Sequence, residues 1–165
     1  MIEDAQGHAL ELLTAADLLA VPVDVLAVAG HCGLRVEQSE SLPASVSGLL
    51  YRGPYRAEIL VNARQPLVRR RFTIAHEIGH WRFGDCGVAL PAEYDWETEY
   101  QSEQERMVNL FAAELLMPEP LVQEELCRCA DLASLSRRFQ VSRPAMRWRL
   151  RELHGKEESE DHLAS

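Results

Sequence analysis

Residues 67–84 read LVRRRFTIAHEIGHWRFG, and the structure expected around them follows from this segment. Pro66 stands just before it, where a proline ring suits the first turn of a helix. Gly84 stands at its end, where glycine commonly stops a helix because it adopts the left-handed conformation without strain. Only Gly79 interrupts the run between them. The pattern therefore predicts one continuous helix over residues 67–83.

The histidines of this segment are spaced for binding a metal ion. Residues four apart lie on one face of a helix, so His76 and His80 can present two imidazoles to the same cation. Glu77 lies beside the first histidine and can reach an attacking water molecule as general base. This arrangement predicts a hydrolytic zinc site with one Zn²⁺ per chain. The competing interpretation is that the three side chains merely lie on a solvated helix face.

Catalytic zinc usually has three protein ligands, so a third must come from elsewhere in the chain. Asp85 and Cys86 follow His80 closely, but Gly84 falls one position later than in the H-E-x-x-H-x-x-G-x-x-H pattern. A glutamate from a second helix, predicted over residues 102–117, suits the site better. Three residues of that helix are candidates: Glu103, Glu105 and Glu114.

Helical phase separates these three glutamates. At about 100° per residue, Glu114 lies about 180° and Glu103 about 160° from Glu105, so at most one of them faces the metal. The apolar residues of the helix lie on the Glu105 side, and small residues beside it would permit close packing against Gly79. We therefore predict Glu105 as the third ligand. The alternative is that Glu105 is an ordinary exposed carboxylate.

The remaining chain predicts an α+β fold, in which a small, mostly antiparallel sheet packs with the helices that carry the H-E-x-x-H site, followed by a helical C-terminal extension. Alternating or β-rich segments, with a turn at Gly53-Pro54, indicate the sheet. The predicted helices cover residues 5–20, 23–32, 132–139 and 143–153, and the predicted strands 34–37, 48–51 and 57–62. We divide the chain into a zinc metallopeptidase-like domain (1–129), a helix-turn-helix-like extension (130–154) and a flexible tail (155–165).

Composition limits the class of protein. The 165 residues have a net charge of −9 and are 47% hydrophobic and 26% charged, as in an ordinary globular protein. The negative charge disfavours wholesale binding to nucleic acid or to anionic membranes. The four cysteines form no C-x-x-C pair, and no export signal or membrane span is visible. These features predict a cytoplasmic protein with free thiols.

The C-terminal segment is the one basic region. Residues 132–146 follow the helix, turn, helix rhythm of a DNA-binding unit. Six arginines stand against Asp131 and Glu152 between residues 131 and 154. If the segment binds DNA, the candidate residues are Arg137, Arg138, Arg143, Arg147 and Arg149. The competing interpretation, which we favour, is a helical pair that closes the hydrophobic core.

Two blocks of sequence resemble the ImmA/IrrE family of metallo-endopeptidases, which are H-E-x-x-H zinc enzymes. Residues 71–80 read RFTIAHEIGH and residues 105–118 read ERMVNLFAAELLMP. In that family the glutamate before an Ala-Asn pair is the third zinc ligand, which implies this role for Glu105, although Val108 replaces the alanine here. The resemblance further implies cleavage of a DNA-binding repressor of the helix-turn-helix type, and through it a part in transcription regulation and stress response.

These patterns predict a zinc-dependent endopeptidase that acts on a protein partner, with Glu77 as base and His76, His80 and Glu105 as ligands. Two alternatives stay open: a zinc-containing transcriptional regulator that contacts DNA, and a toxin-antitoxin-type module that binds its partner without cleaving it. Tyr94, Tyr100 and His31 are weak candidates for stabilising the oxyanion. The sequence specifies neither the cleavage site nor the oligomeric state.

Overall fold

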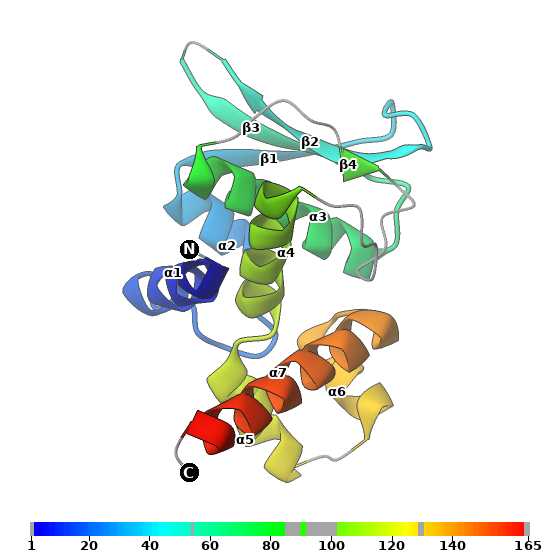
Figure 1. Ribbon diagram of the computed structural model, residues 1–165. Coiled ribbons are helices and arrows are strands. Elements are labelled where there is room, and N and C mark those ends of the chain that lie inside the picture. Colours follow the sequence, from blue (N-terminus) through cyan, green and yellow to red (C-terminus); the bar gives the residue numbers. More distant parts are fainter. Residues whose placement is uncertain (1, 54, 85–89, 92–101, 129–130, 164–165) are drawn as a thin grey trace.

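The computed structural model describes residues 2–53, 55–84, 90–91, 102–128 and 131–163, and shows the predicted α+β fold (Figure 1). One four-stranded sheet has the order β1-β3-β2-β4, with β1 parallel to β3 and the other two pairings antiparallel. The strands are β1 (Leu34–Ser39), β2 (Val46–Arg52), β3 (Ala57–Asn62) and β4 (Leu90–Pro91). The two-residue strand β4 is an addition to the predicted elements.

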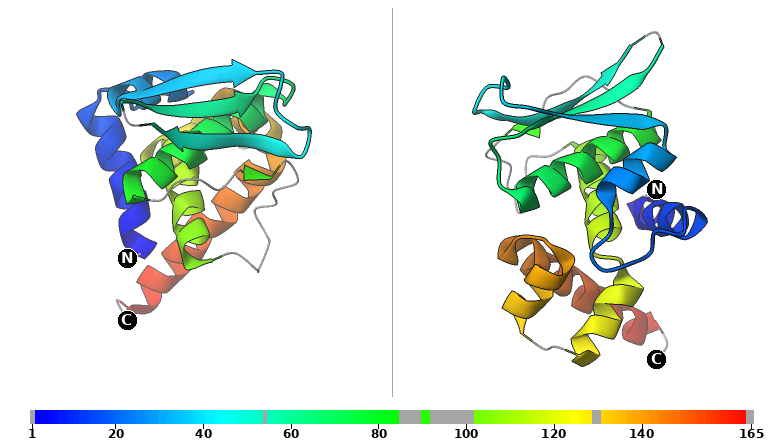
Figure 2. Two further views of the ribbon diagram at one scale, coloured as in Figure 1. Left: turned by 90° about the horizontal axis from the view of Figure 1, so that it is seen from above. Right: turned by 180° about the vertical axis from the view of Figure 1, so that it is seen from behind.

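Helices cover one face of this sheet and extend away from it (Figures 1 and 2). Helix α3 packs against β2 and β3, α2 packs against β1, and α4 crosses α3 and contacts α1. The C-terminal helices lie at the far end of α4 from the sheet. The helices are α1 (Ile2–Ala15), α2 (Val25–His31), α3 (Leu67–Phe83), α4 (Glu103–Leu116), α5 (Glu119–Arg128), α6 (Leu132–Phe139) and α7 (Arg143–Leu163).

Helix α3 has the predicted bounds and lies at the centre of the fold. Gly84 ends it in the left-handed conformation, with φ of 83°. Gly79 lies where α3 and α4 touch: a Cβ added there would lie 3.0 Å from Val108 Cγ1 and 3.2 Å from Phe111 Cδ1. The predicted close packing at Gly79 is therefore confirmed, with Val108 and Phe111 as its neighbours. This contact brings the two helices of the expected site together.

The C-terminal helices share the hydrophobic core of the rest of the molecule. One buried cluster runs from Ala5 of α1 to Leu153 of α7 and includes Leu135 and Met146 of the helical pair. Helix α7 continues to Leu163, beyond its predicted end at Leu153. The division of the chain at residues 129 and 154 stays a prediction.

Strand β3 is an inner strand of the sheet. Its residues 57–62 pair with β1 on one side and with β2 on the other. Its backbone groups are therefore already used, and no strand can be added there. Among the described residues, none of the helices combines the length and apolarity needed to cross a bilayer.

Candidate metal centre

Helices α3 and α4 bring the three predicted ligands together. His76 Nε2 lies 2.9 Å from His80 Nε2 and 3.5 Å from Glu105 Oε2, and His80 Nε2 lies 3.4 Å from Glu105 Oε1. The one-turn spacing on α3 sets the first distance. Ser102 sets the approach of Glu105, because its hydroxyl accepts a hydrogen bond from Glu105 N and so fixes the first turn of α4. We call His76, His80 and Glu105 the metal cluster.

Asn109 orients the first histidine of the metal cluster. It lies one turn after Glu105 on the same face of α4, and its Oδ1 is 2.9 Å from His76 Nδ1. When Nδ1 donates its proton to this oxygen, the lone pair of Nε2 points towards His80 and Glu105. A metal-binding histidine characteristically has such a partner on its other ring nitrogen. Helix α4 therefore supplies both a carboxylate ligand, Glu105, and the amide of Asn109 that fixes the orientation of the His76 imidazole.

Burial and neighbouring groups favour the metal-binding protonation states of His76 and Glu105. His76 and His80 are almost fully buried, whereas the Glu105 side chain is 29% exposed. Burial, reinforced by His80, lowers the pKa of His76 to about 4, so its imidazole is neutral at physiological pH. The hydrogen bond with His80 lowers the pKa of Glu105, which favours the carboxylate. Neutral imidazoles and an ionised carboxylate are the ligand forms that zinc requires.

The distances between the ligand atoms of the metal cluster fit tetrahedral coordination of a metal ion. Zinc binds imidazole nitrogen and carboxylate oxygen at about 2.0–2.1 Å, so two ligand atoms on a tetrahedron lie about 3.3 Å apart. The cluster distances of 2.9, 3.4 and 3.5 Å are close to that value. Within the described part of the chain, this is the one group of three metal-binding side chains that converge in this way. The residues present therefore fit a metal such as zinc.

Glu77 is buried beside the metal cluster without a hydrogen bond from the described residues to either of its carboxylate oxygens. Burial raises the pKa of Glu77 to about 8, and the charge of Glu105 adds to this effect. An unpaired buried carboxylate is unfavourable for stability alone. It is suited to take up a proton, because both oxygens can accept a hydrogen bond from a water molecule.

The other candidate ligands, and the candidates for stabilising the oxyanion, lie away from the metal cluster or outside the described residues. Glu103 is exposed at the start of α4, and Glu114 is buried near the opposite end of that helix. Asp85, Cys86, Tyr94 and Tyr100 fall outside the described residues. His31 ends α2 and lines a shallow pocket with His8 and Arg82, so it is not placed at the metal cluster.

Arg149 corrects the predicted DNA-contacting set. Its side chain is fully buried, where its guanidinium pairs with Glu114 and Glu152 and donates to the carbonyl oxygen of Met117 at 3.1 Å. Gln6 of α1 joins the same group by donating to Glu152 Oε1 at 3.0 Å. The charge of Arg149 is therefore neutralised inside the fold and cannot reach a phosphate. We call Arg149, Glu114 and Glu152 the arginine cluster.

The remaining arginines of the predicted set are exposed. Arg143 and Arg147 lie one turn apart on the outer face of α7, and Arg151 continues this row. Arg137 and Arg138 are exposed on α6, where Arg138 also donates to Glu125 Oε1 at 2.7 Å. The structure thus separates one internal arginine from the others.

Sequence reasoning overlooked Asn109 as a functional residue, although a signal was available. It is a polar residue four positions after Glu105, and such spacing places both on one helix face. In the sequence it counts only among the small residues near Glu105 that permit close packing. A polar residue among apolar neighbours at this spacing indicates a partner for a ligand.

The chain matches known proteins over most of its length. Residues 29–151 match the family model described as the IrrE N-terminal-like domain, a peptidase family. Two curated relatives are radiation response metalloproteases IrrE. That of Deinococcus radiodurans is 33% identical over 153 residues, covering 81% of this chain and 47% of the relative. That of Deinococcus deserti is 36% identical over 99 residues, covering 54% and 34%.

The chain therefore spans at most about half the length of these curated relatives. Among solved structures, a Mycobacterium tuberculosis transcriptional regulator has the same fold, with a TM-score of 0.62 and 17% identity, over 87% of this chain and 45% of that one. The family model covers well over half of this chain and includes both helices of the metal cluster. The chain thus belongs to the ImmA/IrrE family, as its H-E-x-x-H segment and second glutamate block predicted.

Proposed function

We propose that this chain is a zinc-dependent endopeptidase that hydrolyses a peptide bond in a protein partner. The observation that carries the proposal is the convergence of His76, His80 and Glu105 within 3.5 Å of one another beside the buried carboxylate of Glu77. Membership of a peptidase family supports it. Zn²⁺ held by these three side chains would supply a Lewis acid that acidifies water and polarises the scissile carbonyl.

Side chains of the protein provide the proton transfer and hold the ligands in position. Glu77 removes the proton from the attacking water and delivers it to the nitrogen of the departing amine. Burial raises the pKa of Glu77 in the metal-free protein, and the charge of a bound zinc ion would lower it again and so favour the ionised form that acts as base. Asn109 holds His76 in the tautomer that leaves Nε2 free to bind the metal.

The substrate that we propose is a DNA-binding repressor of the helix-turn-helix type. The resemblance to the ImmA/IrrE family suggests this class, and two relatives carry the name radiation response metalloprotease. Cleavage of a repressor in the cytoplasm would connect proteolysis to a change in transcription under stress. This part of the proposal is independent of the chemistry at the metal cluster and requires its own test.

The deciding experiment compares the zinc-loaded protein with its Glu77→Gln variant in cleavage of the repressor encoded nearest to it. Loss of the general base is expected to slow cleavage by about 10²- to 10⁴-fold, because glutamine cannot take up the proton. Zinc content, measured by atomic absorption, should be unchanged because the ligands are intact. Products are identified by mass spectrometry.

Glu103→Gln is the matched control, because this exposed glutamate is only two residues from Glu105 but lies off the metal cluster. It should cleave at the parental rate. Equal cleavage by the parent and Glu77→Gln would contradict the assigned role of Glu77. An intact repressor that nevertheless binds the protein tightly would support the binding module instead.

DNA binding by α6 and α7 is the second candidate function, with the exposed row of Arg143, Arg147 and Arg151 as the specific observation. Its test is the salt dependence of binding to duplex DNA. Phosphate contacts from Arg143 and Arg147 predict that replacing both by glutamine lowers the slope of log affinity against log salt by about two. Arg149 is not part of this surface. A slope unaffected by the two replacements would contradict this function.

A further inference from the structure

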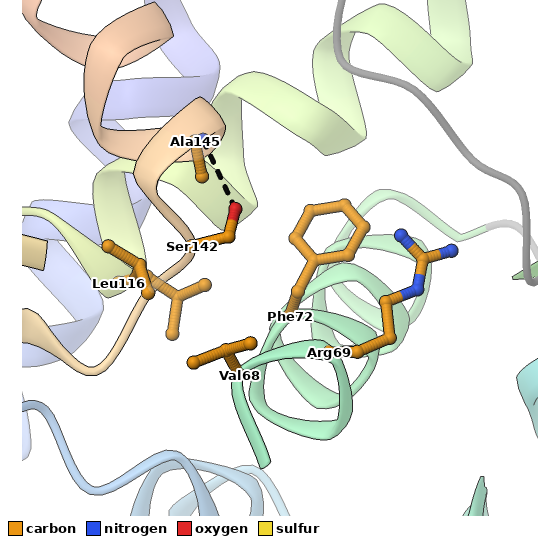
Figure 3. A pocket seen from close by; sticks show the side chains of 7 residues that line it. Val68, Arg69, Phe72, Leu116, Ser142 and Ala145 are labelled. Carbon is orange, nitrogen blue, oxygen red and sulfur yellow. Dashed lines mark hydrogen bonds between the residues drawn. The ribbon is translucent and has the colours of Figure 1, made fainter. Parts of the chain in front are cut away.

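A cavity of about 80 Å³ lies between the start of α3 and the turn that joins α6 to α7 (Figure 3). Its lining includes Val68, Arg69 and Phe72 of α3, Leu116 of α4, and Ser142 and Ala145 at the start of α7. These side chains come from both the helices of the metal cluster and the C-terminal helices. None of them is a predicted ligand or base.

The cavity adjoins the metal cluster through α3. Phe72 lines the cavity and lies one turn before His76, with the centres of the two rings 5.6 Å apart. Arg69 also lines it and lies seven residues before His76, about two turns along α3. A helix rises about 1.5 Å per residue, so the α3 part of the lining lies about 6–12 Å from His76 along the axis. An extended peptide covers that length in two to four residues.

The polar groups around the cavity are already engaged. Ser142 Oγ accepts a hydrogen bond from Ala145 N at 3.2 Å. Arg69 Nε donates to Ser47 Oγ at 3.0 Å, and its guanidinium lies 5.4 Å from the centre of the Phe72 ring. What remains is a mainly hydrocarbon surface with one positive charge beside it. This mainly apolar lining suits an apolar side chain.

The volume of the cavity limits which side chains could enter it. Apolar cavities of about 150 Å³ in proteins accept benzene. A cavity of about 80 Å³ is roughly half as large and suits a branched aliphatic side chain such as that of valine or leucine. Protein interiors are normally packed without such spaces. An apolar cavity this near a catalytic group is therefore a candidate for substrate recognition.

We propose that this cavity receives an apolar side chain of the substrate, two to four residues from the scissile bond, and so contributes to the choice of cleavage site. The inference rests on the proposed peptidase function, but binding of the side chain does not require cleavage. The competing explanation is a packing gap between the C-terminal helices and α3. Filling the cavity distinguishes the two, because a gap can be filled without any effect on recognition.

The first measurement uses the zinc-loaded Glu77→Gln protein, in which binding is observed without turnover. N-acetyl-leucine amide is titrated while the methyl signals of Leu116 and Ala145 are followed by NMR. We expect these signals to shift and the isosteric N-acetyl-asparagine amide to bind at least about tenfold more weakly, because an amide would be buried unpaired. No shift with the leucine probe would overturn the proposal.

The second measurement fills the cavity. Ala145→Leu, added to Glu77→Gln, should weaken binding of the leucine probe by about tenfold or more while leaving zinc content unchanged. Ala133→Leu is the matched control, since it makes the same change on α6 at a half-buried side chain outside the lining. Unchanged binding in a folded Ala145→Leu protein would identify a packing gap. If that protein does not fold, Val68→Ala replaces it and should shift preference from leucine towards phenylalanine.

Cleavage of a peptide library by the parent then separates this inference from the proposed function. We expect valine, leucine or methionine to be enriched at one position two to four residues from the cut, and Ala145→Leu to abolish that enrichment. Leucine binding without any cleavage would reject the peptidase and retain the cavity as a binding site. Cleavage with no apolar preference would retain the peptidase and reject the cavity as its subsite.

Discussion

Helix α4 carries a buried polar cluster near each of its ends, and the two clusters balance their charge in different ways. In the arginine cluster, the carboxylates of Glu114 and Glu152 pair with a guanidinium supplied by the chain itself. In the metal cluster, Glu105 converges with the imidazoles of His76 and His80, an arrangement that suits a cation supplied from outside. A buried charged side chain that is paired with another side chain stabilises the fold. Buried acceptor atoms that converge on one point are instead suited to bind a ligand.

The location of the two clusters agrees with this division. The arginine cluster joins α1, α4 and α7, because Gln6 donates to Glu152 and Arg149 also donates to the Met117 carbonyl. The metal cluster lies where α3 and α4 cross beneath the sheet (Figure 1). Loss of the first should therefore reduce stability most, and loss of the second should reduce metal binding most.

Arg149→Met is expected to have the largest effect on stability. It leaves Glu114 buried without its guanidinium partner, and breaking such a pair reduces the free energy of unfolding by about 3–5 kcal/mol. Urea denaturation followed by circular dichroism measures this change. Arg147→Met, the same substitution at an exposed position of α7, should change it by less than about 0.5 kcal/mol. Equal effects of the two substitutions would remove the basis for the comparison.

Zinc removal should have the next largest effect. With free zinc a thousandfold above its dissociation constant, binding to the folded state alone adds about 4 kcal/mol to the free energy of unfolding. Thermal unfolding of the protein with zinc and after chelation measures the difference. The Glu105→Ala variant should show a much smaller gain from the same zinc concentration, because a ligand is missing. A full gain in that variant would place the metal elsewhere.

Asn109→Ala should weaken zinc binding by about 10- to 100-fold, because His76 loses the acceptor that fixes its tautomer. Competition with a chelator of known affinity measures the loss. Asn109→Asp keeps an oxygen at the same place and should restore most of the affinity. If the alanine and aspartate variants bind zinc equally weakly, Asn109 has a packing role rather than an orienting one.

Breaking an exposed ion pair should have the smallest effect on the free energy of unfolding. Arg128 and Glu124 lie 2.6 Å apart on α5, with both side chains more than half exposed. Glu124→Gln should change the free energy of unfolding by less than about 0.5 kcal/mol, since solvent screens the pair. The same urea assay applies. A loss approaching that of Arg149→Met would show that burial is not what distinguishes the arginine cluster.

Local signals in the sequence were sufficient for the two helices of the site. Pro66 and Gly84 bound α3, and helical phase together with the apolar face of α4 distinguishes Glu105 from Glu114. These inferences succeed because they depend only on neighbours within a few turns. The central place of β3 depends on the parallel partner β1, which lies some twenty residues earlier in the chain, and residues 57–62 contain no sign of that pairing.

Other features could not be read from the sequence for physical reasons. Arginine is rarely buried, so nothing marks Arg149 as internal until Glu114 and Glu152 are seen around it. Strand β4 has only two residues, too few for any periodic pattern. The cavity beside Phe72 is formed by segments up to almost eighty residues apart in the chain, so no local motif describes it.

The contact at Gly79 has a consequence for how relatives of this chain are recognised. A search written as H-E-x-x-H treats position 79 as open to any residue, yet a single added carbon there would lie 3.0 Å from Val108. A sequence with both histidines, both glutamates and a bulky residue at this position would match the pattern while its two helices were held too far apart. The motif is better written as H-E-x-G-H, because the glycine sets the distance between the two helices.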